Sequence, residues 1–246
     1  MGNKAYFISD IHFGLEDKTK ETEKENALIE LINSIESESE LIILGDLFDY
    51  WFEYKYVIQK GYYRFFAALK NASERNVKIH YLIGNHDFLH RDFFRTEFSA
   101  DIYEDNTELE INGKKFYLAH GDGLLPNDKG YLILKKIFRN KFFQKLYSFL
   151  HPDLGIAIAK RTSRKSRDYT QQKDYGEQNA LLKFAEKKID EGFDYIVMGH
   201  SHKKEIYKYK DGFYVNLGSW IEKPYYGVFD GNEFHVLTWE RNEKRF

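Results

Sequence analysis

Five short clusters of Asp, His and Asn constrain this chain more than any other feature, because each directly follows a short apolar run. The apolar runs have the length and composition of buried strands. In α/β sheets, ligand sites form where the loops after the strands converge on one edge. We therefore expect an α/β fold that gathers these clusters at one edge. The clusters are Asp10 and His12 in "SDIH", Asp46 and Asp49 in "GDLFD", Asn85, His86 and Asp87 in "GNHD", His120 and Asp122 in "HGD", and His200 and His202 in "GHSH".

The order of the predicted elements in the first half of the chain supports this fold class. Apolar runs predict strands over 4–9, 40–44 and 77–83, and helical spacing predicts helices over 25–35 and 62–74. Strands that alternate with helices are typical of a layered α/β fold whose early strands are buried.

The second half of the chain has a different pattern. Two hairpins are predicted over 108–120 and 207–216, because each has an Asn-Gly or Asp-Gly pair between short apolar runs. A helix over 179–189, a strand over 193–198 and a last hairpin over 227–239 complete the chain. We expect one domain that covers residues 1–246.

The segment from Lys129 to Lys173 differs from the rest of the chain in charge. It contains twelve Lys or Arg residues and two acids, a charge of +10, so the remainder carries −12. Its apolar residues have helical spacing, yet the segment is too apolar for a solvated helix and too basic for a core helix. We expect an inserted helical cap over 127–173 that faces an anion, which could be nucleic acid, an anionic membrane or a phosphorylated ligand.

The clusters predict a site for two metal ions. The chain has no cysteine, so any metal must bind to His, Asp, Glu or Asn, a ligand set that suits manganese, iron, zinc or magnesium. In Asp-x-His and His-x-His on an extended chain, both side chains point to the same side and can hold one ion. Five clusters offer more ligands than one ion accepts, which favours two ions about 3.5 to 4 Å apart that share a carboxylate.

The N-terminus and the hydropathy of the chain favour a cytoplasmic protein. "MGNKAYFISD" lacks a basic region followed by an apolar run of signal length, and no stretch approaches 18 uncharged apolar residues.

The five motifs, in this order from Tyr6 to Trp220, resemble those of the calcineurin-like metallophosphoesterases. The resemblance implies a layered β-sandwich flanked by helices, with Asp46 bridging two divalent ions. It implies catalytic roles for Asp46, Asn85 and His86, with His86 directed at the substrate and Gly84 allowing a sharp turn. Asp49, Asp87 and Asp122 are interpreted as residues that orient an imidazole or a loop. The implied ligands are Asp10, His12, Asp46 and His202 for the first ion, and Asp46, Asn85, His120 and His200 for the second.

Three segments resemble the UDP-2,3-diacylglucosamine diphosphatases of lipid A synthesis: "GDLFDYWF" at 45–52, the region 120–166, and "VNLGSW" at 215–220. The resemblance implies hydrolysis of the substrate's pyrophosphate to lipid X and UMP, with manganese as the metal. It also implies peripheral contact with the anionic cytoplasmic face of the inner membrane. The implied substrate contacts are Asn85, His86, Asp128, Tyr131, Ser166, Thr170, Lys173 and His200. The candidate acyl-chain residues, which packing of the cap's own helices explains equally well, are Phe138, Phe142, Leu146, Ile156 and Ile158.

Other functions remain open from the sequence. The better-known branch of this subfamily has Arg where this chain has His86, so another lipid-linked or nucleotide diphosphate is an alternative substrate. A nucleic-acid phosphodiesterase would explain the basic segment, but the aromatic residues of that segment have the spacing of a core rather than of a stacking surface. A non-catalytic scaffold would usually lack ligands, and none of the seven implied ligands is missing. The oligomeric state and the accepted acyl lengths stay open.

Overall fold

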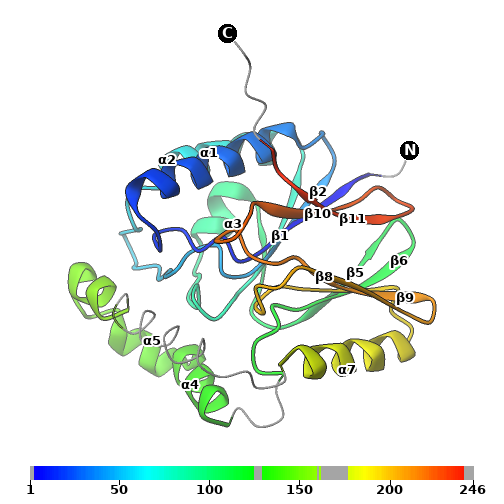
Figure 1. The fold of residues 1–246 in the computed structure, drawn as a ribbon. Helices are drawn as coiled ribbons and strands as arrows, with labels where there is room; N and C mark the ends of the chain where they lie inside the picture. The colour runs from blue at the N-terminus through cyan, green and yellow to red at the C-terminus, as the bar shows by residue number, and fades with distance from the viewer. Residues whose placement is uncertain (1–2, 125–128, 160, 162–176, 241–246) are drawn as a thin grey trace.

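Two β-sheets form the centre of the protein (Figure 1). The structure is a computed structural model, and it describes residues 3–124, 129–159, 161 and 177–240. Within these residues the strand order is β11-β10-β1-β2-β3-β4 in the first sheet and β5-β6-β7-β9-β8 in the second. The first sheet comprises β1 (Ala5–Ile8), β2 (Glu40–Leu44), β3 (Lys78–Leu82), β4 (Asp101–Tyr103), β10 (Tyr225–Phe229) and β11 (Phe234–Thr238). The second comprises β5 (Thr107–Ile111), β6 (Lys114–Leu118), β7 (Tyr195–Met198), β8 (Glu205–Tyr209) and β9 (Gly212–Asn216).

Helices cover the outer faces of both sheets (Figure 1). Helices α1 (Lys18–Ser34) and α2 (Tyr63–Glu74) pack on the first sheet, where their apolar faces contact the outward side chains of β1 to β3. Helix α7 (Glu177–Asp190) packs on the second sheet. Apolar side chains of both sheets, among them Phe7 and Phe116, fill the space between them. The predicted layered α/β fold is confirmed.

Parallel pairing brings the ends of the strands together. Strands β1, β2, β3 and β4 pair in parallel, as do β6, β7 and β9. The five predicted clusters follow β1, β2, β3, β6 and β7. Their carboxyl ends therefore point to the same edge of the two-sheet sandwich, as the sequence pattern predicts.

Three elements differ from the sequence-based expectation. Helix α1 begins at Lys18, earlier than the predicted residue 25, because the side chain of Asp17 accepts hydrogen bonds from the backbone N–H groups of Thr19 and Lys20. Helix α3 (Phe93–Phe98) and strand β4 were not predicted, because both are very short.

The basic segment forms helices beside the layered body (Figure 1). These are α4 (Lys129–Arg139), α5 (Lys141–Tyr147) and a helical stretch at 152–159. Tyr147 and Ile156 pack against a cluster of Tyr50, Phe52 and Leu89, which belong to the loops after β2 and β3. Both ends of the predicted cap at 127–173 lie outside the described residues, so these boundaries stay a prediction. Among the described residues, no helix combines the length and the apolar character that crossing a membrane would need.

Candidate metal centre

The loops that carry the predicted ligands have an unusual backbone. A positive φ is uncommon for residues other than glycine and costs of order 1–3 kcal/mol at each position. Such conformations persist only where the surroundings enforce them, and they are concentrated at functional sites. Positive φ angles occur at Asp10 (51°), His12 (50°), Asp46 (52°), His200 (67°) and His202 (58°).

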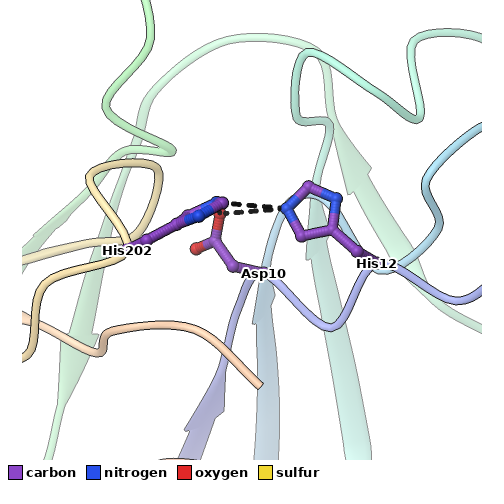
Figure 2. A group of neighbouring side chains, drawn as sticks. All are labelled: Asp10, His12 and His202. Carbon is purple, nitrogen blue, oxygen red and sulfur yellow. Dashed lines mark hydrogen bonds and ion pairs between the residues drawn. The ribbon is translucent and has the colours of Figure 1, made fainter. Parts of the chain in front are cut away.

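Asp10, His12 and His202 form a first group of side chains (Figure 2). The Nε2 atoms of the two histidines lie 3.2 Å apart, and Nε2 of His202 lies 3.3 Å from Oδ1 of Asp10. Nε2 of His12 lies 3.8 Å from the same oxygen. This buried oxygen has no hydrogen-bond partner among the described residues, which is costly for a carboxylate. A cation at this point fits the site, because it would satisfy the oxygen and both imidazoles.

Asp46, His120 and His200 form a second group, and Asn85 adjoins it. Nε2 of His120 lies 3.3 Å from Oδ2 of Asp46 and 3.0 Å from Oδ1 of Asn85. Its other ring nitrogen, Nδ1, donates to the carbonyl oxygen of Leu44 at 2.7 Å. Because that carbonyl can only accept, Nδ1 keeps its proton, so Nε2 is the ring nitrogen that faces Asp46 and Asn85 and could serve as a metal ligand.

Asp46 connects the two groups. Its Oδ2 lies 3.3 Å from Nε2 of His120 in the second group and 3.8 Å from Nε2 of His12 in the first. The structure therefore brings all seven predicted ligands together, and it places the predicted bridging carboxylate between the two sets. Metal binding by these side chains stays a prediction.

The electrostatics of the centre favour ionised carboxylates. Burial opposes the charge of Asp46, but the charges of His120 and His86 hold the pKa of this carboxyl well below its usual range. Burial also opposes the charge of Asp10, whereas the imidazoles of His12 and His202 beside it hold its pKa well below its usual range. Ionised carboxylates beside imidazoles are suitable ligands for a divalent cation.

His86 lies at the border of the first group. Its ring is edge-on to the ring of His12, with centroids 4.9 Å apart, and one ring nitrogen lies close enough to His12 and Asp46 to share an ion with them. The backbone N–H of His86 donates to Oδ1 of Asp46 at 2.9 Å, and Nδ1 lies 3.0 Å from the carbonyl oxygen of Asp49. These two bonds fix the ring, and the predicted role toward the substrate stays a prediction.

Two of the three accompanying carboxylates, Asp87 and Asp49, contact the loops and rings around the centre. Asp87 accepts hydrogen bonds from the backbone N–H groups of Leu47 (2.9 Å) and Gly84 (2.7 Å), which joins the loops after β2 and β3. Oδ1 of Asp49 lies 3.6 Å from Nδ1 of His86. These contacts agree with the interpretation that the carboxylates orient imidazoles or loops.

Glycine is required at position 84 for a different reason from the one expected. Its φ is not among the positive values, so it makes no turn that only glycine permits. A Cβ atom at this position would lie only 2.1 Å from Oδ1 of Asp46. Glycine is therefore needed so that the loop after β3 can approach the bridging carboxylate.

An apolar cavity of about 470 Å³ lies between the cap and the loops after β2 and β3. Phe138 and Leu146, two of the predicted acyl-chain residues, line it, whereas Phe142 and Ile158 do not. Ile156 packs nearby in the cluster that joins the cap to the body. The lining consists of Phe52, Phe88, Ile137, Phe138, Phe143, Gln144, Leu146, Tyr147, Phe149 and Leu150.

Several predicted substrate contacts lie outside the described residues. These are Asp128, Ser166, Thr170 and Lys173, and the side chain of Tyr131 is likewise not described. The sequence analysis missed Lys24, which contacts the backbone of His12. It lies in the polar run "KTKETEKEN", where nothing in the local sequence separates it from the solvated lysines around it.

Comparison with known proteins gives the family and several relatives of this chain. Residues 4–204 match the family model of the calcineurin-like phosphoesterases. A UDP-2,3-diacylglucosamine hydrolase of Porphyromonas gingivalis is 32% identical over 99% of this chain and 100% of that protein. One of Haemophilus influenzae is 29% identical over 93% of this chain and 95% of its own length. A solved archaeal phosphodiesterase, 17% identical, aligns over 96% of this chain and 99% of its own with a TM-score of 0.49.

Proposed function

This chain belongs to the calcineurin-like phosphoesterase family, a family of metal-dependent hydrolases, and we propose that it cleaves the pyrophosphate of UDP-2,3-diacylglucosamine. The products are 2,3-diacylglucosamine 1-phosphate (lipid X) and UMP, and the reaction is a step of lipid A biosynthesis. The names of the relatives from Porphyromonas gingivalis and Haemophilus influenzae support this substrate. We further propose that the resident metals are two manganese ions and that the protein works in the cytoplasm at the inner membrane surface.

The observation that carries the proposal is the position of the apolar cavity beside the metal centre. Phe52 follows Asp49 by three residues and Phe88 follows His86 by two, so the loops that form the centre also form the cavity wall. A substrate with its diphosphate at the centre can therefore place an acyl chain in the cavity. Burial contributes about 0.8 kcal/mol per CH₂ group, so the chains supply a large part of the affinity. A nucleic acid has no group that needs such a cavity.

The residues of the centre have two proposed roles, metal binding and contact with the phosphoryl group. Asp10, His12, Asp46 and His202 would hold one ion, and Asp46, Asn85, His120 and His200 the other. Ions bound there would supply the Lewis acidity that activates water and offsets charge on a phosphoryl group. His86 lies at the border of the first group with Nδ1 directed at the carbonyl oxygen of Asp49, so its ring has a fixed orientation. We assign it to the phosphoryl group, where it can stabilise charge or protonate a leaving oxygen.

The surface of the cap supports membrane contact. Phe142 is 70% exposed and lies in helix α5 with Lys141 and Lys145, and Phe149, 76% exposed, follows the last residue of this helix by two positions. Exposed aromatic groups beside lysines suit an anionic lipid surface, where each cation contributes about 1 kcal/mol. A diacylated substrate resides in such a surface, so the same segment of the cap would contact both the membrane and the substrate.

A substrate comparison with one matched pair of variants tests the function. We expect the manganese-loaded protein to hydrolyse UDP-2,3-diacylglucosamine far faster than UDP-N-acetylglucosamine, a generic aryl phosphodiester or single-stranded DNA. Leu146→Asn should raise the KM for the diacylated substrate about tenfold, because the leucine lines the cavity, and should leave the aryl diester unaffected. Leu154→Asn is the control, since Leu154 is similarly exposed (52% against 57%) but does not line the cavity.

Two results would contradict the proposal. Equal rates on the acylated and the unacylated nucleotide sugar would show that the acyl chains are not recognised. Rapid cleavage of single-stranded DNA would instead favour a nucleic-acid phosphodiesterase.

A further inference from the structure

We propose that Lys24, in helix α1, is a positioning residue for the ion site formed by Asp10, His12 and His202. The inference rests on the proposed metal centre. Lys24 belongs to none of the five motifs, and its role follows from its contacts with the backbone that carries His12.

The ammonium group of Lys24 is buried beside the metal centre. Its Nζ donates to the carbonyl oxygen of His12 at 3.1 Å, and its side chain is 4% exposed. It pairs with Oε1 of Glu21 at 2.9 Å and with Oε2 of Glu16 at 3.6 Å, and it lies 5.9 Å from the centre of the Phe13 ring. A buried cation with this many partners is held in one place.

The partner of Lys24 holds the same loop at two further points. Oε2 of Glu21 accepts from the backbone N–H of Gly14, and Oε1 accepts from that of Glu16, both at 2.9 Å. The Lys24–Glu21 pair therefore connects helix α1 to the carbonyl of His12 and to two N–H groups of the residues that follow. An ion pair that only stabilised the helix would not contact the loop at three backbone groups.

The loop needs such support because His12 has a strained backbone. Its φ is +50°, and its N–H donates to the carbonyl oxygen of Asp46 at 3.0 Å. Asp46 thus holds one side of the His12 backbone and Lys24 holds the other. Without the ammonium group, the carbonyl of His12 loses the shorter of its two hydrogen bonds and keeps only the one from the backbone N–H of Leu15 at 3.3 Å. The loop can then relax toward an unstrained conformation. The imidazole would then move away from Asp10 and His202.

Metal binding separates this role from a purely structural one. Metal-free protein is titrated with Mn²⁺, and free Mn²⁺ is followed by its EPR signal, which yields two binding constants without any substrate. His12→Ala identifies the constant of the first site. Loss of a residue that orients a ligand typically lowers metal affinity 10- to 100-fold. We therefore expect Lys24→Met to weaken the first site 10- to 100-fold and the second by less than about threefold.

Three variants make the result specific. Lys20→Met is the matched control, because Lys20 also pairs with Glu16 (3.2 Å) but is 63% exposed and does not reach His12, so both constants should stay within about twofold. Lys24→Arg keeps a charged donor and should restore part of the affinity. Glu21→Gln is a milder change that can be used if Lys24→Met folds poorly. It is expected to weaken the binding constant of the first site alone.

The double variant completes the test. If Lys24 acts through His12, Lys24→Met should have no further effect in the His12→Ala background. Unchanged constants in Lys24→Met, equal weakening of both sites, or full additivity with His12→Ala would overturn the inference. If His12→Ala itself weakens neither constant, the metal-centre assignment is wrong, and the role of Lys24 falls with it.

Discussion

His90 lies in the loop after β3, five residues beyond the predicted ligand Asn85, and its replacement tests how this loop is held in place. The ring packs against Trp51, Tyr81 and Phe94, with centroids 6.2, 4.5 and 5.1 Å away. Burial lowers the pKa of His90 from 6.5 to about 3. We predict that His90→Phe makes the protein less sensitive to mild acid.

The direction of this pH effect follows from proton binding by His90 in the folded and the unfolded protein. In the folded protein His90 stays neutral down to about pH 3, whereas in the unfolded chain it binds a proton below about pH 6.5. Stability is therefore lost as the pH falls through the unfolded pKa, and the loss is complete near the folded one. At 1.36 kcal/mol per unit, the loss at pH 5 is about 2 kcal/mol, and below pH 3 it approaches about 5 kcal/mol.

Two charged groups face His90 and need to be considered. Oε1 of Glu53 lies 3.7 Å from Nδ1, and the charge of Arg95 adds slightly to the lowered pKa. Both are present in the protein and in the variant, so the difference between the two proteins isolates the imidazole. Phenylalanine has a similar shape and suits the aromatic surroundings.

Urea unfolding of metal-free protein at pH 7.0 and pH 5.0, in the presence of a chelator, measures the effect. Relative to the unmodified protein, His90→Phe should gain about 2 kcal/mol in the free energy of unfolding between the two pH values. His151→Phe is the control, because His151 is exposed and should leave the pH dependence unchanged. The same pH dependence in His90→Phe as in the unmodified protein would refute the reasoning.

The remaining predictions concern the centre and the cap. Asp46→Ala should lose both ions and all activity, since its carboxylate lies between the two groups; a variant that keeps two ions per chain and turns over substrate would disprove the bridging role. His86→Ala should keep its metals while turnover falls 10²- to 10⁴-fold, and loss of one ion would make His86 a ligand. His86→Arg should recover part of that rate if the ring stabilises charge, and no recovery would favour proton transfer. Lys135→Met should raise the KM for the diacylated substrate about tenfold at an unchanged rate on aryl diesters, because Lys135 lies 2.6 Å from Asp122 and joins the cap to the centre; an unchanged KM would count against it. Binding to anionic vesicles should weaken with salt, and equal binding to neutral vesicles would argue against membrane contact.

The strands and the clusters of Asp, His and Asn that follow them could be predicted because their signals are local. An apolar run followed by Asp-x-His or Gly-Asn-His-Asp marks the end of a strand without knowledge of the rest of the fold. Helix α3 has no such signal. Glu53 accepts from the backbone N–H of Phe93, the first residue of the helix, at 3.3 Å, and from those of the two preceding residues, Arg91 and Asp92, at 2.7 and 3.1 Å. This cap lies about 40 residues away in the sequence, so no local pattern reveals it.

Lys24 and Gly84 show a second limit of sequence patterns. Lys24 belongs to a run of charged residues that is typical of a solvated segment, yet the fold buries its ammonium group against the backbone of His12. Gly84 was expected to allow a sharp turn, whereas the structure needs glycine there for the close approach to Asp46. The contact of Lys24 joins helix α1 to the loop after β1, and that of Gly84 joins the loops after β3 and β2, so both distances depend on the folded structure.

The contact between Lys135 and Asp122 links the two halves of the proposed function. Asp122 follows the predicted ligand His120 by two residues, and the charges of His120 and Lys135 lower the pKa of its carboxyl to about 2 despite burial. The carboxylate is therefore charged at every pH at which the protein is expected to work, so Lys135 holds the cap beside the group of Asp46, His120 and His200. On the other side, the cluster of Tyr50, Phe52 and Leu89 joins the cap to the loops after β2 and β3. Because the cap is attached at both points to segments that also carry ligands, a substrate whose acyl chain fills the cavity would be held in register with the ions. Acyl recognition should then affect turnover as well as affinity, since binding energy gained in the cavity can position the diphosphate for reaction.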